Sequence, residues 1–359
     1  MKPAYRVPSM GEINAIPWNG YTAVSTFSGC GGSSLGYRMA GFRVAWASEF
    51  IPAAADTYRA NASAYTQLDT RDIREVAPGD ILNATGLDVG EIDLFDGSPP
   101  CASFSTAGKR EAGWGQVKAY SSTKQRTDDL FFEYARLLKG LQPRTFVAEN
   151  VSGLVIGKAK GYFLMILAAL RDAGYKVTAR LLDASWLGVP QARKRIIFVG
   201  VRNDLAADPA HPTPLPYRYT LRDAIGDLPG AFDLIEHDPE TGQRLPLAGY
   251  SIEPYWHELE PGKCHPKRTS LTRMAWDRPA ATIVARGGGD GTATITMPDQ
   301  PRYLTLAELR RIGGFPDDFE LTGLYRHRWE RIGRAVPPVM MAHVAATVRD
   351  EILAKVVSA

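Results

Sequence analysis

The stretch TAVSTFSGCGGSSLG, residues 22–36, decides the fold class expected for this chain of 359 residues. It begins as a short apolar run of the kind found in buried strands and ends where a helix-like segment begins. A turn with glycine at positions 29, 31 and 32 joins the two. Glycines in such a turn let backbone N–H groups approach a ligand at a helix N-terminus, which is how α/β proteins hold nucleotide-like groups. A plain tight turn is the alternative.

Short apolar runs and helix-like segments alternate over the first 200 residues. The predicted buried strands are residues 23–27, 43–47, 92–95, 145–148, 177–182 and 196–201, and the predicted helices are residues 33–40, 51–60, 129–140 and 161–173. This alternation is typical of a doubly wound α/β domain with a mainly parallel sheet. We therefore predict that fold for the main domain.

The composition changes after Val201. A proline-rich connector at residues 208–216 precedes a region, ending near Gln300, that shows few helical faces. This change predicts a second, smaller and more irregular domain. Helical spacing returns over residues 306–312 and 339–357. The expected division is residues 1–202 plus 333–359 for the main domain, 203–300 for the small domain, and 301–332 for a hinge or return segment.

Composition and charge exclude several classes of protein. The chain is 45% hydrophobic, as globular proteins are, and it holds no apolar run of about 20 residues that could cross a membrane. Residues 1–20 lack the order of a secretory signal, so a cytoplasmic location is expected. The net charge is only +3, but residues 101–200 carry 16 basic and 7 acidic side chains, which favours a polyanionic partner. The three cysteines show no paired spacing, which argues against disulfides and metal sites.

Two features refine the ligand expected at the glycine turn. A dinucleotide-binding pattern would place glycine at position 34, where this chain has Ser34, and this disfavours a nicotinamide-dependent oxidoreductase. Glu49 lies 20 positions after Gly29, at the end of the second predicted strand, where a carboxylate can accept hydrogen bonds from ribose hydroxyls. The interpretation is a nucleoside-containing cofactor, with a solvated strand end as the alternative for Glu49.

Cys101 follows Pro99 and Pro100 in the stretch DGSPPCASFS, residues 96–105. The preceding strand ends at Phe95, so the thiol is expected at the carboxyl edge of the sheet, where open α/β proteins bind ligands. The prolines restrict the backbone and can fix the direction of the thiol. Taken alone, a single cysteine is more often a small buried side chain.

Two further motifs lie beside predicted strands: Glu149-Asn150-Val151 and Gln191-Ala192-Arg193-Lys194-Arg195. Together with the glycine turn, the acidic strand end and the Pro-Cys pair, they make the sequence resemble the DNA cytosine-5 methyltransferases. The resemblance spans nearly the whole chain in the family's order, and it includes Asp72-Ile73, the stretch RPAATI at 278–283 and Gly-x-Ala-Val at 333–336.

The resemblance implies a Rossmann-like, class I S-adenosylmethionine-dependent methyltransferase fold with a target-recognition domain at residues 203–300. The implied reaction is methyl transfer from S-adenosyl-L-methionine to C5 of a cytosine flipped out of a specific sequence of double-stranded DNA. Cys101 would add to C6 as a thiolate, Glu149 would hydrogen-bond the N3 and amino edge, and Arg193 would hold the O2 edge. Asn150 would brace the site.

The resemblance also implies two groups of binding residues. Those expected to contact the cofactor are Phe27, Gly29, Gly31, Gly32, Glu49, Phe50, Asp72, Ile73, Pro100, Leu130, Arg334, Ala335 and Val336. Those expected to contact DNA are Ser105, Lys109, Arg110, Gln191 and Arg195, the first three within a loop, residues 105–126, that would close over phosphates. Arg195 could instead brace the site. A cognate restriction endonuclease is a candidate partner, no metal is expected, and the enzyme is expected to be a monomer.

One position departs from the family pattern. The closing motif usually reads Gly-Asn-Ala/Ser-Val, and this chain has Arg334 in place of the asparagine. One interpretation is that Arg334 turns away to a phosphate or to a carboxylate such as Asp96 or Glu330. The other is that it pairs with the carboxylate of carboxy-S-adenosyl-L-methionine, which would make the product 5-carboxymethylcytosine.

Two alternatives concern the substrate and the activity itself. A methyltransferase of this family could act on RNA, and a catalytically silent relative could bind DNA without modifying it. The intact set of Cys101, Glu149 and Arg193 weighs against the silent relative.

Overall fold

The computed structural model describes residues 2–100, 118–120, 123–125, 129–155, 159–289 and 291–357. The chain divides into two compact units. The sheet unit comprises Asn14–Leu182, Lys194–Thr213 and Met341–Ala359, and the irregular unit comprises Met1–Ile13, Asp183–Arg193 and Pro214–Met340. Each unit is therefore built from three separate parts of the sequence.

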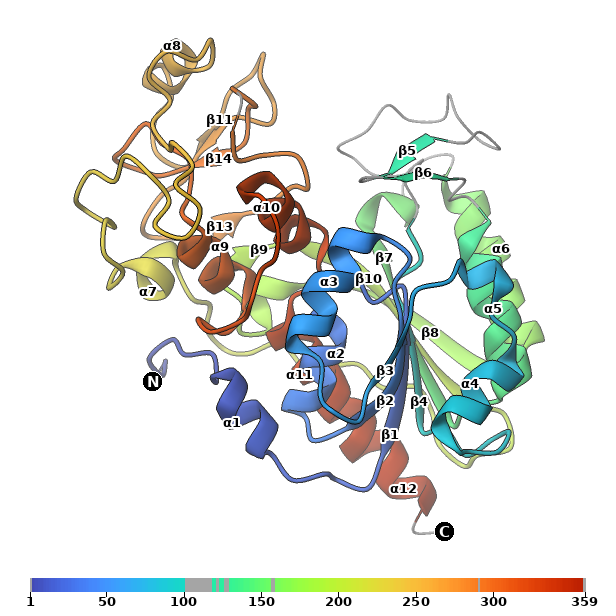
Figure 1. The fold of residues 1–359 in the computed structure, drawn as a ribbon. Helices are drawn as coiled ribbons and strands as arrows, with labels where there is room; N and C mark the ends of the chain where they lie inside the picture. Colours follow the sequence, from blue (N-terminus) through green and yellow to red (C-terminus); the bar gives the residue numbers. More distant parts are fainter. Residues whose placement is uncertain are drawn as a thin grey trace. The chain divides into compact units, whose positions relative to one another are not determined.

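A seven-stranded sheet in the order β3-β2-β1-β4-β7-β10-β8 forms the centre of the sheet unit (Figure 1). Its strands are β1 (Thr22–Thr26), β2 (Arg43–Ser48), β3 (Gln67–Asp69), β4 (Leu94–Gly97), β7 (Thr145–Val151), β8 (Tyr175–Asp183) and β10 (Lys194–Arg202). Neighbouring strands from β3 to β7 are parallel, whereas β10 is antiparallel to β7. This sheet confirms the predicted doubly wound, mainly parallel fold.

Helices cover both faces of this sheet, with α2 and α3 on one face and α4, α5 and α6 on the other (Figure 1). Their bounds are α2 (Gly32–Met39), α3 (Pro52–Asn61), α4 (Pro78–Thr85), α5 (Leu130–Leu141) and α6 (Ala159–Asp172). The chain ends in α11 (Pro338–Thr347), a π-helical stretch (Val348–Leu353) and α12 (Ala354–Val357). Among the described residues, no helix is both long and apolar enough to cross a membrane.

Helix α5 shows how the apolar spacing becomes packing. Leu130, Tyr134 and Leu138 recur every four residues and are all buried, as expected for one face of a helix packed on a sheet. The Tyr134 ring stacks on Phe95 of β4 with 4.8 Å between ring centroids, and its hydroxyl donates to the Phe95 carbonyl at 3.1 Å. These contacts hold the carboxyl end of β4, from which the Pro-Cys loop leaves.

Short elements make up the irregular unit, which agrees with the few helical faces in its sequence. They are the 3-10 turn Ala184–Trp186, β9 (Gln191–Ala192), α7 (Leu221–Ile225), α8 (Glu253–His257), β11 (Lys263–Cys264), β12 (Thr272–Arg273), β13 (Ala280–Ala281), β14 (Ile295–Thr296), α9 (Leu306–Gly313) and α10 (Tyr325–Arg334). Small sheets join β11-β12-β14 and β13-β9. The remaining elements of the described chain are α1 (Met10–Ala15), the 3-10 turns Ile73–Glu75 and Ser152–Val155, and the antiparallel pair β5 (Lys118–Tyr120) and β6 (Thr123–Gln125).

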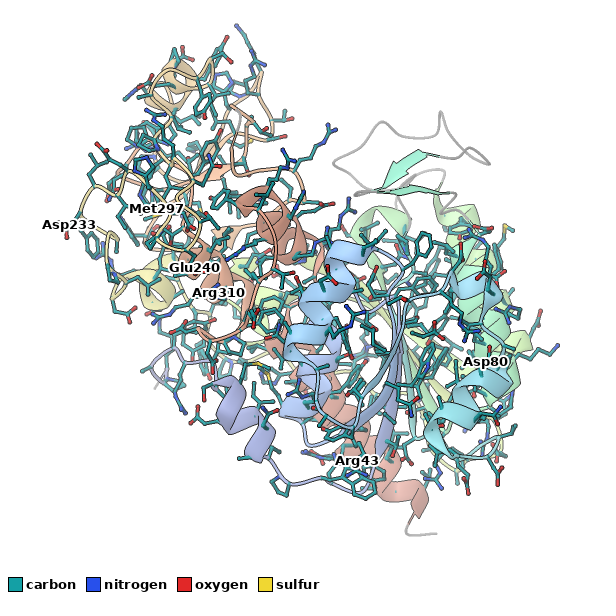
Figure 2. The ribbon with its side chains drawn as sticks, viewed as in Figure 1. Arg43, Asp80, Asp233, Glu240, Met297 and Arg310 are labelled. Carbon is teal, nitrogen blue, oxygen red and sulfur yellow. The ribbon has the colours of Figure 1, made fainter. Side chains whose placement is uncertain are left out.

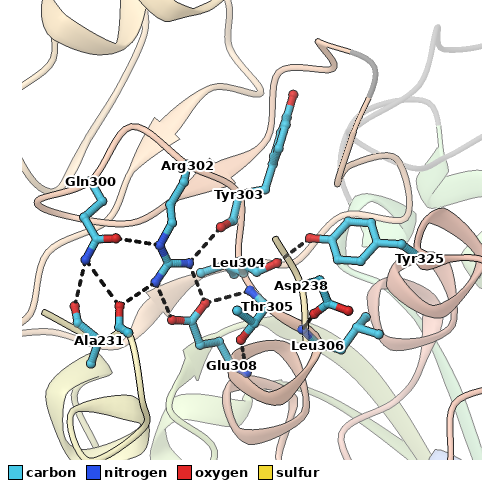
Figure 3. Close-up of polar contacts among 11 residues, drawn as sticks. Ala231, Asp238, Gln300, Arg302, Tyr303, Leu304, Thr305, Leu306, Glu308 and Tyr325 are labelled. Atoms are coloured by element: carbon cyan, nitrogen blue, oxygen red, sulfur yellow. Dashed lines mark hydrogen bonds and ion pairs between the residues drawn. The ribbon is translucent and has the colours of Figure 1, made fainter. Parts of the chain in front are cut away.

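A fully buried ion pair stabilises the irregular unit at the start of α9 (Figure 3). The Arg302 guanidinium lies 2.7 Å from the Glu308 carboxylate and also donates to the Gly230 carbonyl at 2.9 Å. Glu308 in turn accepts from the backbone N–H of Thr305 at 2.7 Å, which caps the helix. Buried charged groups and helix caps thus stabilise a unit whose strands are each only two residues long. On the same helix, Arg310 pairs with Glu240 (Figure 2).

The boundaries of the two compact units differ from the division expected from the sequence. The segment 301–332 lies in the same unit as residues 214–300, and so do residues 183–193 and 333–340. The reason is pairing over long distances in the chain, because β9 pairs in parallel with β13. The assignment of target recognition to residues 203–300 stays a prediction.

Candidate active site

The glycine turn after β1 adopts a conformation that few side chains tolerate. Phe27, Gly29 and Gly31 have φ values of +53°, +58° and +96°. At Gly29 an added Cβ would meet no atom within 4 Å, whereas at Gly31 it would lie 3.2 Å from the Tyr58 ring. The turn therefore leaves open space at Gly29 and packs closely at Gly31.

Glu49, at the end of β2, binds this turn directly. Its carboxylate accepts hydrogen bonds from the backbone N–H of Gly29 at 2.8 Å and from that of Ile51 at 2.7 Å. The predicted acidic strand end thus lies beside the predicted glycine turn, so the alternative of a solvated strand end for Glu49 is wrong.

The other residues expected to contact the cofactor have mixed surroundings. Asp72 follows β3, and its carboxylate accepts from the Arg74 backbone N–H at 3.0 Å and pairs with the Arg74 guanidinium at 3.0 Å. Phe50 is exposed, whereas Ile73 and Leu130 are buried in the apolar core. Pro100 is half-buried.

This set of groups fits a nucleoside. Glu49 and Asp72 follow β2 and β3, which are parallel neighbours, so both carboxylates lie at one edge of the sheet. Carboxylates accept hydrogen bonds from ribose hydroxyls and from an adenine amino group, and the exposed ring of Phe50 offers an apolar surface beside them. The open space at Gly29 adds room for a ligand close to the backbone.

Glu149 and Arg195 form an ion pair at the carboxyl end of β7. The Arg195 Nε lies 2.7 Å from the Glu149 carboxylate, and both side chains are largely buried. Burial lowers the pKa of Arg195, while the adjacent Glu149 charge opposes the shift. Close by, the Asn150 amide donates to the Pro99 carbonyl at 3.2 Å and so supports the loop that leads to residue 101.

Arg193 has different surroundings from those expected of a residue that binds the O2 edge of cytosine. It belongs to the irregular unit, is almost fully buried, and donates to the carbonyls of Ile283 and Gly333 at 3.0 Å each. The guanidinium therefore braces its own unit. It is Arg195, expected at DNA phosphates, that contacts Glu149.

Gln191 also differs from its expected contact with DNA. Its side chain is buried, its amide nitrogen donates to the Ile312 carbonyl at 3.3 Å, and its amide oxygen accepts from the Ile283 N–H at 3.1 Å. Both ends of the amide are thus used inside the irregular unit.

The unusual Arg334 ends helix α10. Its Nε lies 2.7 Å from the Glu330 carboxylate, one helical turn earlier, which is one of the two arrangements that the sequence left open. Ala335 and Val336 follow the helix and are buried. Four expected site residues, Cys101, Ser105, Lys109 and Arg110, lie outside the described residues.

One group near the site was not predicted to take part. Asp96 on β4 is 1% exposed, and its carboxylate accepts from the Tyr37 hydroxyl and from the Ser25 hydroxyl, both at 2.7 Å. Burial raises its pKa to about 7, and the charge of Glu149 adds to the shift. A carboxylate inside an apolar strand run, IDLFDG at residues 92–97, was the only signal for it in the sequence.

The fold and this arrangement define a class of protein. A doubly wound sheet whose first strand enters a glycine turn, with carboxylates after the next two strands, is the fold of class I S-adenosylmethionine-dependent methyltransferases. Residues 21–350 match the family described as C-5 cytosine-specific DNA methylase, and the chain belongs to this family. It is therefore a DNA (cytosine-5)-methyltransferase with S-adenosyl-L-methionine as methyl donor.

Relatives by sequence and by structure agree with this membership. The chain is 33% identical over 346 residues to the Type II methyltransferase M.PspPI of Psychrobacter sp. (strain TA137), covering 91% of this chain and 78% of the relative. It is 31% identical over 350 residues to M.MthTI of Methanothermobacter thermautotrophicus, covering 91% and 97%. The crystal structure of S. pombe Dnmt2 methyltransferase shares the fold, with a TM-score of 0.62, 16% identity, and coverage of 92% of this chain and 98% of that one.

Proposed function

We propose that this enzyme methylates C5 of a cytosine flipped out of a specific sequence in double-stranded DNA, through a covalent bond between the Cys101 sulfur and C6 of the ring. The observation that supports the proposal most is the buried ion pair between Glu149 and Arg195. A carboxyl group next to a guanidinium can bind both the N3 edge and the O2 edge of one cytosine ring.

The chemistry explains why these groups are needed. Cytosine C5 is a weak nucleophile, so the Cys101 thiolate adds to C6 while Glu149 delivers a proton to N3, and the displaced electron pair reaches C5. Bound S-adenosyl-L-methionine supplies a methyl group that is activated by its sulfonium. Loss of the C5 proton to a base, followed by departure of the thiolate, restores the aromatic ring.

The geometry favours Arg195 over Arg193 at the O2 edge. Arg195 already contacts Glu149, whereas the Arg193 guanidinium is occupied by two buried carbonyls. In this proposal Arg193 holds the irregular unit together and Arg195 stabilises the charge that develops on O2.

Phe27, Gly29, Gly31, Gly32, Glu49, Phe50, Asp72, Ile73, Pro100 and Leu130 are proposed to hold the cofactor. Residues 203–300 are proposed to read the DNA sequence. The Type II names of M.PspPI and M.MthTI suggest a restriction-modification setting with a cognate endonuclease. The contacts of Ser105, Lys109 and Arg110 with DNA, like those of Ala335 and Val336 with the cofactor, stay predictions.

The pairing of Arg334 with Glu330 favours the ordinary methyl donor, because the arginine charge already has a partner within its own helix. Mass spectrometry of cytosine from DNA treated with each donor tests this. We expect 5-methylcytosine only, with no change of product in Arg334→Asn. Formation of 5-carboxymethylcytosine that is lost in Arg334→Asn would instead support the carboxylated donor.

The covalent step is tested with duplex DNA that contains 5-fluorocytosine, because fluorine at C5 blocks the final loss of a proton. We expect an adduct that survives denaturing electrophoresis with the unaltered enzyme and disappears in Cys101→Ser. Cys264→Ser is the matched control and should leave the adduct intact, since Cys264 is an exposed thiol in the irregular unit. An adduct that persists in Cys101→Ser would overturn the proposal, and methyl acceptance from tRNA but not duplex DNA would favour the RNA alternative.

A further inference from the structure

The buried Asp96 is linked to the glycine turn by hydroxyl groups. Its carboxylate accepts from the Ser25 hydroxyl at 2.7 Å, and the Ser25 oxygen accepts from the Ser28 hydroxyl at 3.0 Å. Ser28 belongs to the turn itself, next to Gly29. A second donor to the carboxylate, at 2.7 Å, is the Tyr37 hydroxyl on α2. Asp96 therefore connects β1, α2 and the turn.

The strand register brings Asp96 close to Glu149. Asp96 is the partner of Val147 in the parallel pair of β4 and β7, and paired residues point to the same face of a sheet. Glu149 is two residues after Val147, so its side chain lies on that face as well. Strand spacings place the Cα atoms of Asp96 and Glu149 about 8 Å apart, one strand over and two residues along.

The groups around Asp96 do not neutralise it. On the described elements packed against it, the titratable side chains that face it are Tyr37 of α2, Tyr58 of α3, Tyr134 of α5 and Glu149 of β7. The Arg195 guanidinium is paired with Glu149, and Arg38 acts on Tyr58. Two hydroxyl donors are weaker partners for a buried carboxylate than a cation would be. Ionised Asp96 therefore acts on Glu149 mainly by repulsion.

We propose that Asp96 is a positioning residue for methyl transfer, which fixes the glycine turn through Ser25 and Ser28 and repels negative charge on Glu149, so that Glu149 keeps the proton it delivers to N3. The inference rests on the proposed role of Glu149. The role proposed for Asp96 explains how Glu149 can act as an acid although it is paired with Arg195. The Arg195 guanidinium favours loss of the Glu149 proton, whereas the charge of Asp96 opposes that loss.

The test is the pH dependence of single-turnover methyl transfer, measured from pH 5 to pH 9 on DNA with the donor in excess. Asp96→Asn keeps the shape of the side chain and removes its charge. We expect the alkaline limb of the profile to move down by about one pH unit, because a unit charge at this separation in a partly buried site has an effect of that size. The single-turnover rate of Asp96→Asn should equal that of the unaltered enzyme at pH 5 to 6. At pH values above the alkaline limb it should be about tenfold lower.

A second variant covers the case in which Asp96→Asn does not fold. Tyr37→Phe removes one hydrogen bond that favours ionised Asp96, so Asp96 stays protonated to higher pH and the limb should move in the same direction by a smaller amount. Asp93→Asn is the matched control. Asp93 is also a buried carboxylate, but it lies before β4 and pairs with Arg144, so the variant should leave the profile in place.

The outcomes separate this inference from the proposed function. If Asp96→Asn and Tyr37→Phe both give profiles that superimpose on that of the unaltered enzyme while Cys101→Ser is inactive, the role of Asp96 is wrong and the proposed function stands. If Cys101→Ser still transfers the methyl group, the proposed function fails first. If Asp93→Asn moves the limb as much as Asp96→Asn does, the shift reflects general loss of buried charge, and the inference is overturned.

Discussion

Arg193 and Arg195 are two positions apart, yet their surroundings differ completely. The chain passes from the irregular unit to the sheet unit between Arg193 and Lys194. Arg193 therefore donates to carbonyls of the irregular unit, whereas Arg195 enters β10 opposite Val151 and reaches Glu149. A shared motif thus contains one bracing residue and one residue that contacts the proposed acid.

Substitution of each arginine should affect a different property. In Arg195→Ala the single-turnover rate should fall about 100- to 1,000-fold, as when one charge-stabilising donor is removed from an active site. Arg193→Ala should lower the free energy of unfolding by about 3 kcal/mol, because it leaves two buried carbonyls without their charged donor. Rapid-quench kinetics and urea unfolding measure the two effects. A larger kinetic loss in Arg193→Ala at unchanged stability would show that the arginine roles are reversed.

Asp96 should make the stability of the protein depend on pH. Burial raises its pKa from 3.8 to about 7, so between these values the folded chain holds a proton that the unfolded chain has released. Stability from this group is therefore fully present below pH 3.8 and is lost as the pH rises towards 7. From pH 5 to pH 8 the free energy of unfolding should fall by about 2.5 kcal/mol more in the unaltered protein than in Asp96→Asn. A difference that stays constant with pH in urea titrations would contradict this.

At the scale of elements, the turn after β1 and the start of α9 were predicted to different extents. The glycine spacing predicted the turn, because only glycine readily takes a φ such as the +96° of Gly31. Apolar spacing predicted a helix over residues 306–312, and in the structure the capping pair Thr305 and Glu308 begins it. That Glu308 also binds Arg302 could not be predicted, because the ion pair depends on how the loops at Gly230 and Arg302 meet.

Gly31→Ala should weaken binding of S-adenosyl-L-methionine about tenfold. The new Cβ adds backbone strain of about 1 to 2 kcal/mol at positive φ, and it would lie 3.2 Å from the Tyr58 ring. Isothermal titration calorimetry measures the affinity. Gly86→Ala is the matched control, since Gly86 has a φ of +70° at the end of α4 with no neighbour within 4 Å of an added Cβ. Equal affinity losses in the two variants would assign the effect to general strain.

Removal of one partner of the buried ion pair at α9 should lower the free energy of unfolding much more than replacement of both partners by apolar residues. Arg302→Met leaves Glu308 buried without its counter-charge and should destabilise the protein by about 3 to 5 kcal/mol. The double variant Arg302→Met with Glu308→Leu should recover much of this loss, because neither charge is then buried. Urea unfolding of the single and double variants measures both. No recovery in the double variant would show that the capping of Thr305 by Glu308 contributes more than the ion pair.

At the scale of the whole molecule, the two units are interleaved along the chain. The irregular unit takes residues 183–193 from a stretch that otherwise builds the sheet, and β9 in this stretch pairs with β13. Interleaving of this kind has no signature in composition, so the sequence predicted the return of the chain to the main domain at residues 333–359 but not the insertion of residues 183–193 into the irregular unit. The proline-rich connector did mark the return to the irregular unit, which resumes at Pro214.

A fragment of residues 214–340 should therefore fail to fold alone. It lacks β9 and the Arg193 hydrogen bonds to Ile283 and Gly333. A fusion of residues 183–193 to residues 214–340 through a short linker should be better ordered, since the Leu215 N–H already bonds the Trp186 carbonyl at 2.8 Å. Amide dispersion in NMR spectra compares the two. A well-dispersed spectrum from 214–340 alone would show that the added strand is dispensable.

The sequence by itself determined the fold class, the cofactor, the family and the candidate nucleophile and acid. Apolar runs, glycine turns and strand-end carboxylates are local patterns, and they predicted the fold class and a nucleoside-containing cofactor, because a parallel sheet brings its strand ends to one edge. The family, S-adenosyl-L-methionine and the roles of Cys101 and Glu149 followed from the resemblance that the motifs carry. The tertiary structure alone decided which arginine contacts Glu149, that Gln191 is used inside the irregular unit, and that Asp96 lies on the same face as Glu149. These facts depend on the register between strands and on contacts between residues that are far apart in the sequence. Gln191 and Ile283, for example, are more than 90 positions apart. No local pattern encodes them, because the partner that satisfies a buried polar group is chosen only when distant segments pack together.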